Sequence, residues 1–277
     1  MKILIADSGA TKTDWALVQD GKPVYVRTGG MHPAWLDPES EVRNLRESFR
    51  DFNPDRIHFY GAGCSDEVTS QPLSDLLQEL FGSTPCELYD DLTAVVHAFL
   101  GQEEGVAAIL GTGAASGHFK KGERISLAAS LGFALGDEGS GADIGKSILK
   151  HYFRDGFSTE AAATVEIALG GMDYHDVMQK IYQSPSPGSW LGSLTAKVLS
   201  GGMGEEVSEL VNFRLNRFAE VFLKQYHLPH GAPVVISGGV ASSLRQPLTD
   251  VLKAGGFNNM RIERSPITEL VRKISRT

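Results

Sequence analysis

The chain has 277 residues, of which 42% are hydrophobic and 22% are charged, and its formal net charge is −8. Such a length and composition fit a globular protein of about two domains with sizeable cores. The negative charge argues against a nucleic-acid groove or an anionic membrane surface, which need basic footprints, and no apolar run approaches the length of a membrane span. A small substrate accompanied by a metal ion suits this charge better.

The chain contains two cysteines, Cys64 and Cys86, and neither belongs to a C-x-x-C pair. Nothing therefore indicates a zinc site or a disulfide-stapled secreted fold, although a disulfide between the two stays open. The sequence begins directly with a predicted strand, without a basic region, a long apolar segment or a cleavage site. We expect a cytoplasmic protein.

A first glycine turn lies within residues 3–18, ILIADSGATKTDWALV, which read as strand, turn and strand. Gly9 lets the backbone approach phosphate oxygens, and Thr11 and Lys12 add hydroxyl and ammonium donors. Asp7, at the end of the first strand, can hold Mg²⁺ directly or through its waters. The pattern predicts an anion and metal site, with an ordinary hairpin and a commonplace turn lysine as the alternative.

A second copy of this pattern lies within residues 106–119, VAAILGTGAASGHF, whose turn is Gly111, Thr112 and Gly113. Both copies continue into a third apolar stretch, so each half of the chain begins with a predicted three-stranded meander. A third turn, Gly238 and Gly239, separates a strand from a helix in VVISGGVASSL. Three glycine turns in two similar halves indicate a nucleotide held between duplicated domains.

The remaining elements alternate between helical and strand periodicity. In the first half they give the order βββαβαβα, and the strands that follow helices should add to the meander's sheet in parallel. Their predicted ranges are helix 40–52, strand 57–60, helix 72–81, strand 86–89 and helix 93–100. The second half repeats the meander and ends with strand 233–237, helix 241–254, strand 260–263 and helix 266–274. We expect domains at 1–103 and 104–277, the second with a helical insertion at about 133–230.

Two adjacent carboxylates, Asp90 and Asp91, follow the strand at 86–89. A residue at the carboxyl end of a sheet strand faces the crevice where ligands of open α/β sheets bind. Neighbouring side chains on an extended chain point to opposite faces, so only one of the two can serve as a general base. The alternative for Asp91 is an N-cap of the following helix.

The loop GFALGDEGSG, residues 132–141, is rich in glycine and acidic. Its glycines favour close approach of the backbone to a ligand, whereas Asp137 and Glu138 could also simply solvate the loop or favour the next helix N-terminus. Ser140 and Asp143 have the spacing of a capping box for that helix.

These motifs resemble a known family. DSGATKT, LGTGAASG and SGGVAS in two meander-based halves are similar to the actin-like ATPase and sugar-kinase superfamily, which implies two ribonuclease H-like domains. LGFALGDEGSGADIG resembles the BadF/BadG/BcrA/BcrD-type ATPase family, whose sugar-phosphorylating members are N-acetylglucosamine kinases. The resemblance extends over essentially the whole chain and implies ATP and Mg²⁺ as cofactors.

The resemblance also implies residue roles. Asp7 matches the acidic residue that handles Mg²⁺, and Asp91 matches the carboxylate that faces the sugar hydroxyl. Asp137 matches an acidic residue that holds the sugar. The matching phosphate and nucleoside turns are Gly9, Thr11 and Lys12, then Gly111, Thr112 and Gly113, then Gly238 and Gly239.

The sequence departs from the family pattern in the predicted sugar site. His32-Pro33 replaces the usual Asn-Pro, although a loop histidine beside proline is often incidental. Leu131, before Gly132, replaces an aromatic residue expected ahead of the acidic loop. Both changes concern substrate recognition, and the phosphate motifs are intact.

Three functions follow as hypotheses. The first is an ATP-dependent kinase of a small amino sugar, N-acetylglucosamine foremost. The second is an ATPase that activates a partner reductase or dehydratase, which the two unclustered cysteines support poorly. The third is a nucleotide-binding regulator without catalysis. We expect no nucleic-acid or membrane partner, and a homodimer is the assembly considered beside the monomer.

Overall fold

The computed structural model of the chain describes residues 1–50 and 52–275. The chain forms two compact units, unit 1 with Met1–Gly101 and Ser265–Thr277, and unit 2 with Gln102–Arg264. The predicted second domain, residues 104–277, therefore differs from unit 2 at its C-terminal end, because the last helix packs on unit 1.

Unit 1 contains a five-stranded sheet in the order β3-β2-β1-β4-β5. The predicted meander is confirmed, since β1 pairs antiparallel with β2, and β2 antiparallel with β3. The two later strands add in parallel, β4 beside β1 and β5 beside β4. The strands are β1 (Lys2–Ser8), β2 (Lys12–Gln19), β3 (Lys22–Gly29), β4 (Arg56–Gly61) and β5 (Cys86–Asp90).

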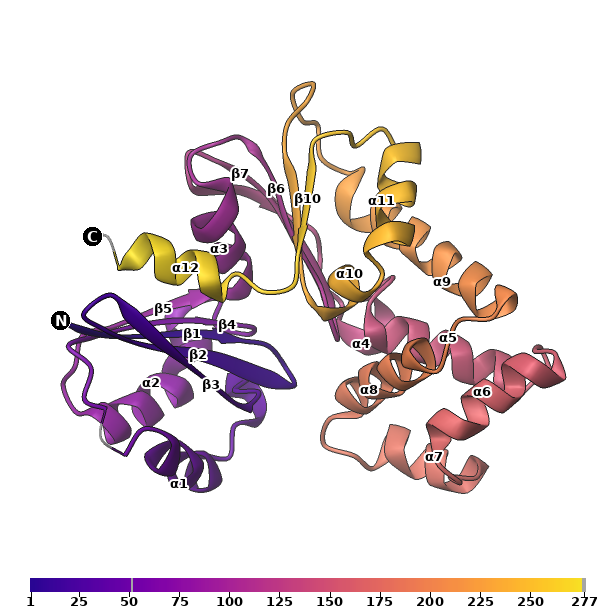
Figure 1. Cartoon of the computed structure of the whole chain (residues 1–277), viewed down its shortest axis with the longest axis horizontal. Helices are drawn as coiled ribbons and strands as arrows, with labels where there is room; N and C mark the ends of the chain where they lie inside the picture. Colours follow the sequence, from indigo (N-terminus) through magenta and orange to yellow (C-terminus); the bar gives the residue numbers. More distant parts are fainter. Residues whose placement is uncertain (51, 276–277) are drawn as a thin grey trace. The chain divides into compact units, whose positions relative to one another are not determined.

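Helices cover both faces of this sheet (Figure 1). Because strand side chains alternate between faces, Leu4 and Ala6 of β1 join the core cluster beneath α1 and α2, whereas Ile3 and Ile5 join the cluster that contains Leu270 of α12. The helical elements of unit 1 are η1 (Pro33–Trp35), α1 (Pro38–Ser48), α2 (Glu67–Phe81), α3 (Asp91–Val95), η2 (Val96–Leu100) and α12 (Ile267–Ile274).

Two helices of unit 1 differ from their sequence-based ranges by four or more residues at one end. The helix predicted at 40–52 ends at Ser48, and Asp51 lies outside the described residues. The helix predicted to begin at Pro72 begins at Glu67, because Asp66 and Thr69 form a capping box five residues earlier in the chain. Gly82 ends that helix with a positive φ, as predicted.

Unit 2 repeats the sheet plan of unit 1. Its strand order is β10-β9-β6-β7-β8. Read in reverse, the order of unit 1 is β5-β4-β1-β2-β3, so the meander β6-β7-β8 takes the place of β1-β2-β3. Strand β9 pairs in parallel with β6 and with β10. The strands are β6 (Gly105–Leu110), β7 (Ala114–Lys120), β8 (Glu123–Leu127), β9 (Val234–Ser237) and β10 (Met260–Glu263).

A run of helices separates β8 from β9, where the sequence predicts a helical insertion. It comprises α4 (Gly132–Leu135), α5 (Gly141–Tyr152), α6 (Thr159–Leu169), α7 (Tyr174–Tyr182), α8 (Pro187–Ser200), α9 (Glu205–Phe218) and η3 (Ala219–Leu223). Between β9 and β10 lie α10 (Gly239–Ser243) and α11 (Arg245–Ala254). Among the described residues, no helix is long and apolar enough to cross a membrane.

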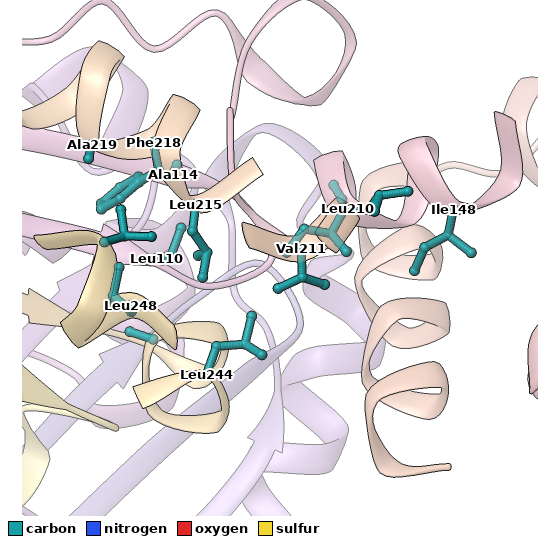
Figure 2. Close-up of a cluster of buried hydrophobic side chains, with 14 of the residues drawn as sticks. Leu110, Ala114, Ile148, Leu210, Val211, Leu215, Phe218, Ala219, Leu244 and Leu248 are labelled. Atoms are coloured by element: carbon teal, nitrogen blue, oxygen red, sulfur yellow. The ribbon is translucent and has the colours of Figure 1, made fainter. Parts of the chain in front are cut away.

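The core of unit 2 supports the second glycine turn, residues 111–113. Leu110 and Ala114, which flank the turn at the ends of β6 and β7, are buried in this core. Figure 2 shows them beside Leu215 and Phe218 of α9 and near Leu248 of α11. Helices of the insertion and of the β9–β10 connection thus fix the strand ends that present residues 111–113.

Candidate functional site

The first glycine turn is fixed by buried hydrogen bonds at the end of β1. The Gly9 N–H donates to the Lys12 carbonyl at 2.9 Å and closes the turn. The Ser8 hydroxyl accepts from the Met31 N–H at 3.1 Å, which ties the turn to the loop after β3. A methyl group at position 30 would lie 2.5 Å from the Ala10 carbonyl group, so Gly30 is required by this close packing.

Lys12 is held by an ion pair on the same strand. Its Nζ lies 3.1 Å from Asp14 Oδ2, and Arg27 Nε lies 2.6 Å from Asp14 Oδ1. Burial raises the pKa of Asp14, but the hydrogen bond from Arg27 and the charge of Lys12 outweigh it and leave the pKa lowered. Lys12 is therefore a positioned cation, although a phosphate would share it with Asp14.

The structure separates the roles of the two adjacent carboxylates after β5. Asp90 is the N-cap of α3, and its Oδ1 accepts from the Thr93 N–H and hydroxyl at 2.7 Å each. The alternative reading of Asp91 as the cap is therefore wrong, because the residue before it satisfies the helix N-terminus. Asp91 is the first residue of the helix, at the carboxyl end of β5.

Asp91 and Asp7 lie near enough to influence each other. Burial and, to a smaller extent, the negative charge of Asp7 raise the pKa of Asp91 to about 6, against the effect of nearby backbone N–H groups. Burial likewise raises the pKa of Asp7 to about 6, opposed by a hydrogen bond from Ser265. Unit 1 thus holds two perturbed carboxyl groups at the carboxyl ends of β1 and β5, a feature typical of functional sites.

His32 lies beside the turn that follows β4. Its Nδ1 accepts from the Ala34 N–H at 3.2 Å, so the ring caps η1. A methyl group at Gly63, whose φ is positive, would lie 2.7 Å from His32 Nε2. Burial lowers the pKa of His32, so the ring is neutral at pH 7. Because Nδ1 accepts, the neutral ring carries its proton on Nε2 and offers a donor there.

In unit 2 the second glycine turn is joined to the N-terminus of α5. The Gly111 N–H donates to the Gly113 carbonyl at 3.0 Å. The first N–H groups of α5, those of Gly141 and Ala142, donate to the carbonyls of Gly111 and Thr112 at 2.8 and 3.0 Å. The glycine-rich acidic loop, which precedes α5, is thereby brought to this turn.

The third glycine turn also contacts the second. Gly238 has a φ of 141°, and a methyl group there would lie 2.3 Å from the Leu110 carbonyl oxygen. The Gly238 N–H donates to the Glu263 carbonyl at 3.0 Å. Packing therefore requires glycine at 238. The close contact of Gly238 with Leu110 and Gly111 also brings the next residue, Gly239, toward the turn at 111–113.

Asp137 lies against the second glycine turn. Only 7% of the residue is exposed, and its Oδ1 accepts from the Ala114 N–H at 3.2 Å. A methyl group at Gly113 would lie 3.1 Å from Oδ2. Burial raises the pKa of Asp137, against the Ala114 N–H and the charge of Lys146. The predicted role of Asp137 toward a sugar stays a prediction, and its contacts here are with the second glycine turn.

Asp143 has a role that the sequence does not reveal. Ser140 caps α5 as predicted, but the Asp143 carboxylate does not complete the capping box. Its Oδ2 instead accepts from the Gly139 N–H at 2.8 Å and from Arg214 Nε at 2.6 Å. Asp143 is 5% exposed, and Arg214 comes from α9, 71 positions later. No local spacing indicates this buried ion pair, which fastens the acidic loop to the insertion.

Three predicted nucleotide contacts are glycines without a structural reason to be glycine. Gly9 and Gly111 have no positive φ, and neither does Gly239. No atom lies within 4 Å of a methyl group added at Gly111 or Gly239, and at Gly9 the nearest, the Lys12 carbonyl oxygen, lies 3.9 Å away. Open space beside a glycine backbone is what an approaching ligand needs.

The other predicted sugar contacts lie in unit 2. Leu131 is 59% exposed, and Gly132 has a positive φ at the start of α4. His32 and Asp91 belong to unit 1. Within the described residues, no group of three or more His, Cys, Asp or Glu side chains could form a metal cage.

Solved structures of known proteins are similar to this chain. No protein-family model matches the chain, and no curated protein matches it. Among solved structures, an inferred N-acetylglucosamine kinase from Porphyromonas gingivalis is similar, with 27% identity, coverage of 98% of this chain and 97% of that one, and a TM-score of 0.87. A second, from Chromobacterium violaceum, has 20% identity, 98% coverage of both chains and a TM-score of 0.75.

Component A of (R)-2-hydroxyglutaryl-CoA dehydratase from Acidaminococcus fermentans is also similar, at 14% identity and a TM-score of 0.53, over 98% of this chain and 95% of that one. The fold is that of the actin-like ATPases. The predicted fold class, two α/β domains of one plan with helices inserted in the second, is confirmed. The actin-like fold is shared by proteins of different function, so the function has to be argued from the site.

Proposed function

We propose that this protein is an ATP-dependent kinase that phosphorylates an amino sugar, N-acetylglucosamine, at its primary hydroxyl. The observation that carries the proposal is the pair of partly buried carboxyl groups of Asp7 and Asp91. They lie at the carboxyl ends of β1 and β5, the strands on either side of β4 in the sheet of unit 1, and Asp7 directly precedes the first glycine turn. The similarity over nearly the whole chain to an inferred N-acetylglucosamine kinase supports the substrate class.

The glycine turns would bind the phosphates of ATP. Gly9, Thr11 and Lys12 form the first predicted contact, and the backbone at Gly9 is open to a ligand. Residues 111–113 and Gly239 form the others, supported by the core of unit 2. Backbone N–H groups in such turns are suited to anionic oxygens, and the N-terminus of a helix adds a favourable partial charge.

The residues of unit 1 fit Mg²⁺ as well. Mg²⁺ in kinases is held by one or two carboxylates together with substrate phosphates and water, so a cage of protein ligands is not required. Asp7 offers such a carboxylate, and within the described residues its Oδ1 has no hydrogen-bond partner. When bound, Mg²⁺ would supply neutralisation of the phosphate charge.

Asp91 would act as the general base. A carboxylate with a pKa of about 6 is ionised at pH 7 and still basic enough to accept a proton from a sugar hydroxyl. The oxygen so activated would attack the γ-phosphorus, the bond to the β-phosphate oxygen would break, and ADP would leave. Because Asp90 caps α3, Asp91 is not needed to hold the helix N-terminus.

The proposed acceptor accounts for the two departures in the sugar site. The neutral His32 ring carries a proton on Nε2, so it can donate a hydrogen bond as the amide of asparagine would. Leu131 offers an apolar contact in place of an aromatic one. Apolar contacts discriminate weakly between analogues, so we expect N-acetylglucosamine to be accepted together with another amino sugar.

The finer family assignment belongs to the same proposal. The motif LGFALGDEGSGADIG supports membership of the BadF/BadG/BcrA/BcrD-type ATPases, and the proposed use of ATP agrees with the expected cytoplasmic location. Against the activator function, the chain has two cysteines, and Cys64 is buried within unit 1.

The test is a coupled ADP-release assay over hexoses, hexosamines, N-acetylhexosamines and N-acetylmuramate. We expect N-acetylglucosamine to stimulate ADP release, with product phosphorylated at the primary hydroxyl by NMR. The matched control is the 6-deoxy analogue of N-acetylglucosamine, which should bind but not stimulate turnover. Stimulation only by an acceptor other than an amino sugar would overturn the substrate, and acceptor-independent hydrolysis alone would overturn the kinase.

A further inference from the structure

Ser265 lies at the point where the chain leaves unit 2 and returns to unit 1. Its hydroxyl donates a hydrogen bond to Asp7 Oδ2 at 2.6 Å, across 258 positions of sequence. This distance is typical of a hydroxyl bonded to an ionised carboxylate, the stronger class of hydrogen bond. A residue far from every recognised motif therefore touches the carboxylate at the centre of the candidate site.

The serine hydroxyl is itself held in place. Its Oγ accepts from the Ile267 N–H at 3.3 Å, so the first turn of α12 occupies one lone pair and the hydroxyl proton is directed to Asp7. The helix is anchored on the sheet, because Leu270 and Val271 pack in one buried cluster with Ile3 and Ile5 of β1. The donor and the strand that carries Asp7 are thus parts of one packed body.

This bond leaves the Asp7 carboxylate with one oxygen fixed and one oxygen available. Within the described residues, Ser265 makes the hydrogen bond to this side chain, and it does so at Oδ2. A carboxylate on a metal ion binds best when its orientation is set by a partner on the other oxygen, and losing such a partner typically weakens the metal site.

We propose that Ser265 is a positioning residue that orients Asp7 for Mg²⁺ and so tightens the binding of Mg²⁺–ATP. This inference rests on the proposed function, since it assigns Asp7 to the metal. The alternative is a purely structural role, in which Ser265 only stabilises the start of α12 through its contact with the Ile267 N–H. The two readings differ in what the loss of the hydroxyl does to metal-dependent binding.

The experiment is calorimetric binding of the β,γ-imido analogue of ATP, with Mg²⁺ and with EDTA, so that no turnover is needed. We expect Ser265→Ala to weaken binding about tenfold in Mg²⁺, by analogy with other outer partners of metal ligands, and to leave binding in EDTA unchanged. Ser265→Thr keeps the hydroxyl and should retain affinity within about threefold of the natural chain.

The control is Val271→Ala, which loosens the packing of α12 without touching Asp7. It should lower the melting temperature and leave Mg²⁺-dependent affinity unchanged. In an Asp7→Asn background, Ser265→Ala should cause no further loss of Mg²⁺-dependent affinity, because the group it orients is gone.

The outcomes separate the two proposals. Equal effects of Ser265→Ala with Mg²⁺ and with EDTA, or a Val271→Ala variant that behaves alike, would overturn the positioning role and leave the kinase proposal intact. The same holds if the serine variant adds its full loss in the Asp7→Asn background. Absence of Mg²⁺-dependent nucleotide binding by the natural chain would overturn both.

Discussion

The two units share one sheet plan, but the carboxylates near their glycine turns have different surroundings. In unit 2, Asp143 is bonded to Arg214 and to a backbone N–H, and Asp137 accepts from the Ala114 N–H. In unit 1, burial raises the pKa of both Asp7 and Asp91 to about 6, and no arginine or lysine forms an ion pair with either among the described residues.

This difference shows how the two units of a duplicated fold can take different roles. The satisfied carboxylates of unit 2 hold glycine backbone in shape, which is a structural task for a buried, bonded anion. The carboxylates of unit 1 have hydrogen-bond donors but no ion pair with an arginine or lysine among the described residues, and their pKa values are raised to about 6. Such perturbed groups are characteristic of sites that act on a ligand. The proposed function accordingly gives the catalytic carboxylates to unit 1, whereas the two carboxylates of unit 2 hold the second glycine turn and the acidic loop in place.

The largest expected effect of a substitution is the loss of turnover at Asp91, which tests the contrast between the two units. We expect Asp91→Asn to lower kcat by roughly 100- to 10,000-fold, the usual contribution of a general base, because an amide cannot accept the proton. Nucleotide affinity should stay within about twofold of the natural chain. The matched control is Asp90→Asn, which preserves an N-cap acceptor for Thr93 and should leave kcat nearly unchanged. Equal turnover in the two variants would remove Asp91 from the catalytic role.

The next largest effect concerns the buried pair of unit 2. Asp143→Ala leaves the partly buried Arg214 guanidinium without its anion, and we expect a loss of up to about 3–5 kcal/mol in the free energy of unfolding. Chemical denaturation measures it. The exposed pair Arg217–Glu220 is the control, since Glu220→Ala should cost at most about 1 kcal/mol. Similar losses at both positions would show that Asp143 does not fasten the acidic loop.

Contacts between residues far apart in the chain show how far the sequence could predict the structure. The repeated meander follows from local alternation, and the confirmed sheet order follows from the connections. Asp7 and the glycine turns could be found because each motif is continuous in the chain. Arg214 and Ser265 could not, because their partners lie 71 and 258 positions away and no spacing encodes such contacts.

The assignment of α12 to unit 1 was missed for a related reason. The helix has the amphipathic pattern of any helix after a strand, and Leu270 and Val271 would suit the core of either unit. The choice between Asp90 and Asp91 as N-cap was likewise open, because both are equally good capping residues and only the backbone geometry selects one.

A smaller effect should separate glycines required by packing from glycines open to a ligand. Gly111→Ala meets no atom within 4 Å and needs no positive φ, so we expect a folded protein with nearly unchanged melting temperature. Its nucleotide affinity should fall about tenfold, because the methyl group would occupy the space of a phosphate. Gly238→Ala is the contrasting variant, since its methyl group meets the Leu110 carbonyl and should destabilise the fold itself. Unchanged nucleotide affinity in Gly111→Ala would contradict a phosphate contact there.

The last prediction concerns the dependence of stability on pH that arises from unit 1. Asp7 and Asp91 have a pKa of about 6 in the folded chain against an ordinary value of 3.8. Between these values the folded state binds more protons than the unfolded state, so the contribution of the two groups to stability falls as pH rises from about 4 to 6. Replacing both by asparagine removes this contribution. We expect the double variant to melt at a higher temperature than the natural chain at about pH 7.5, and the difference to shrink toward pH 4. Thermal melts without nucleotide or Mg²⁺, taken in parallel for both proteins, cancel the titration of all other carboxylates. A difference in melting temperature that is independent of pH would mean that the two carboxyl groups titrate normally in the folded protein, and the contrast with unit 2 would then rest on geometry alone.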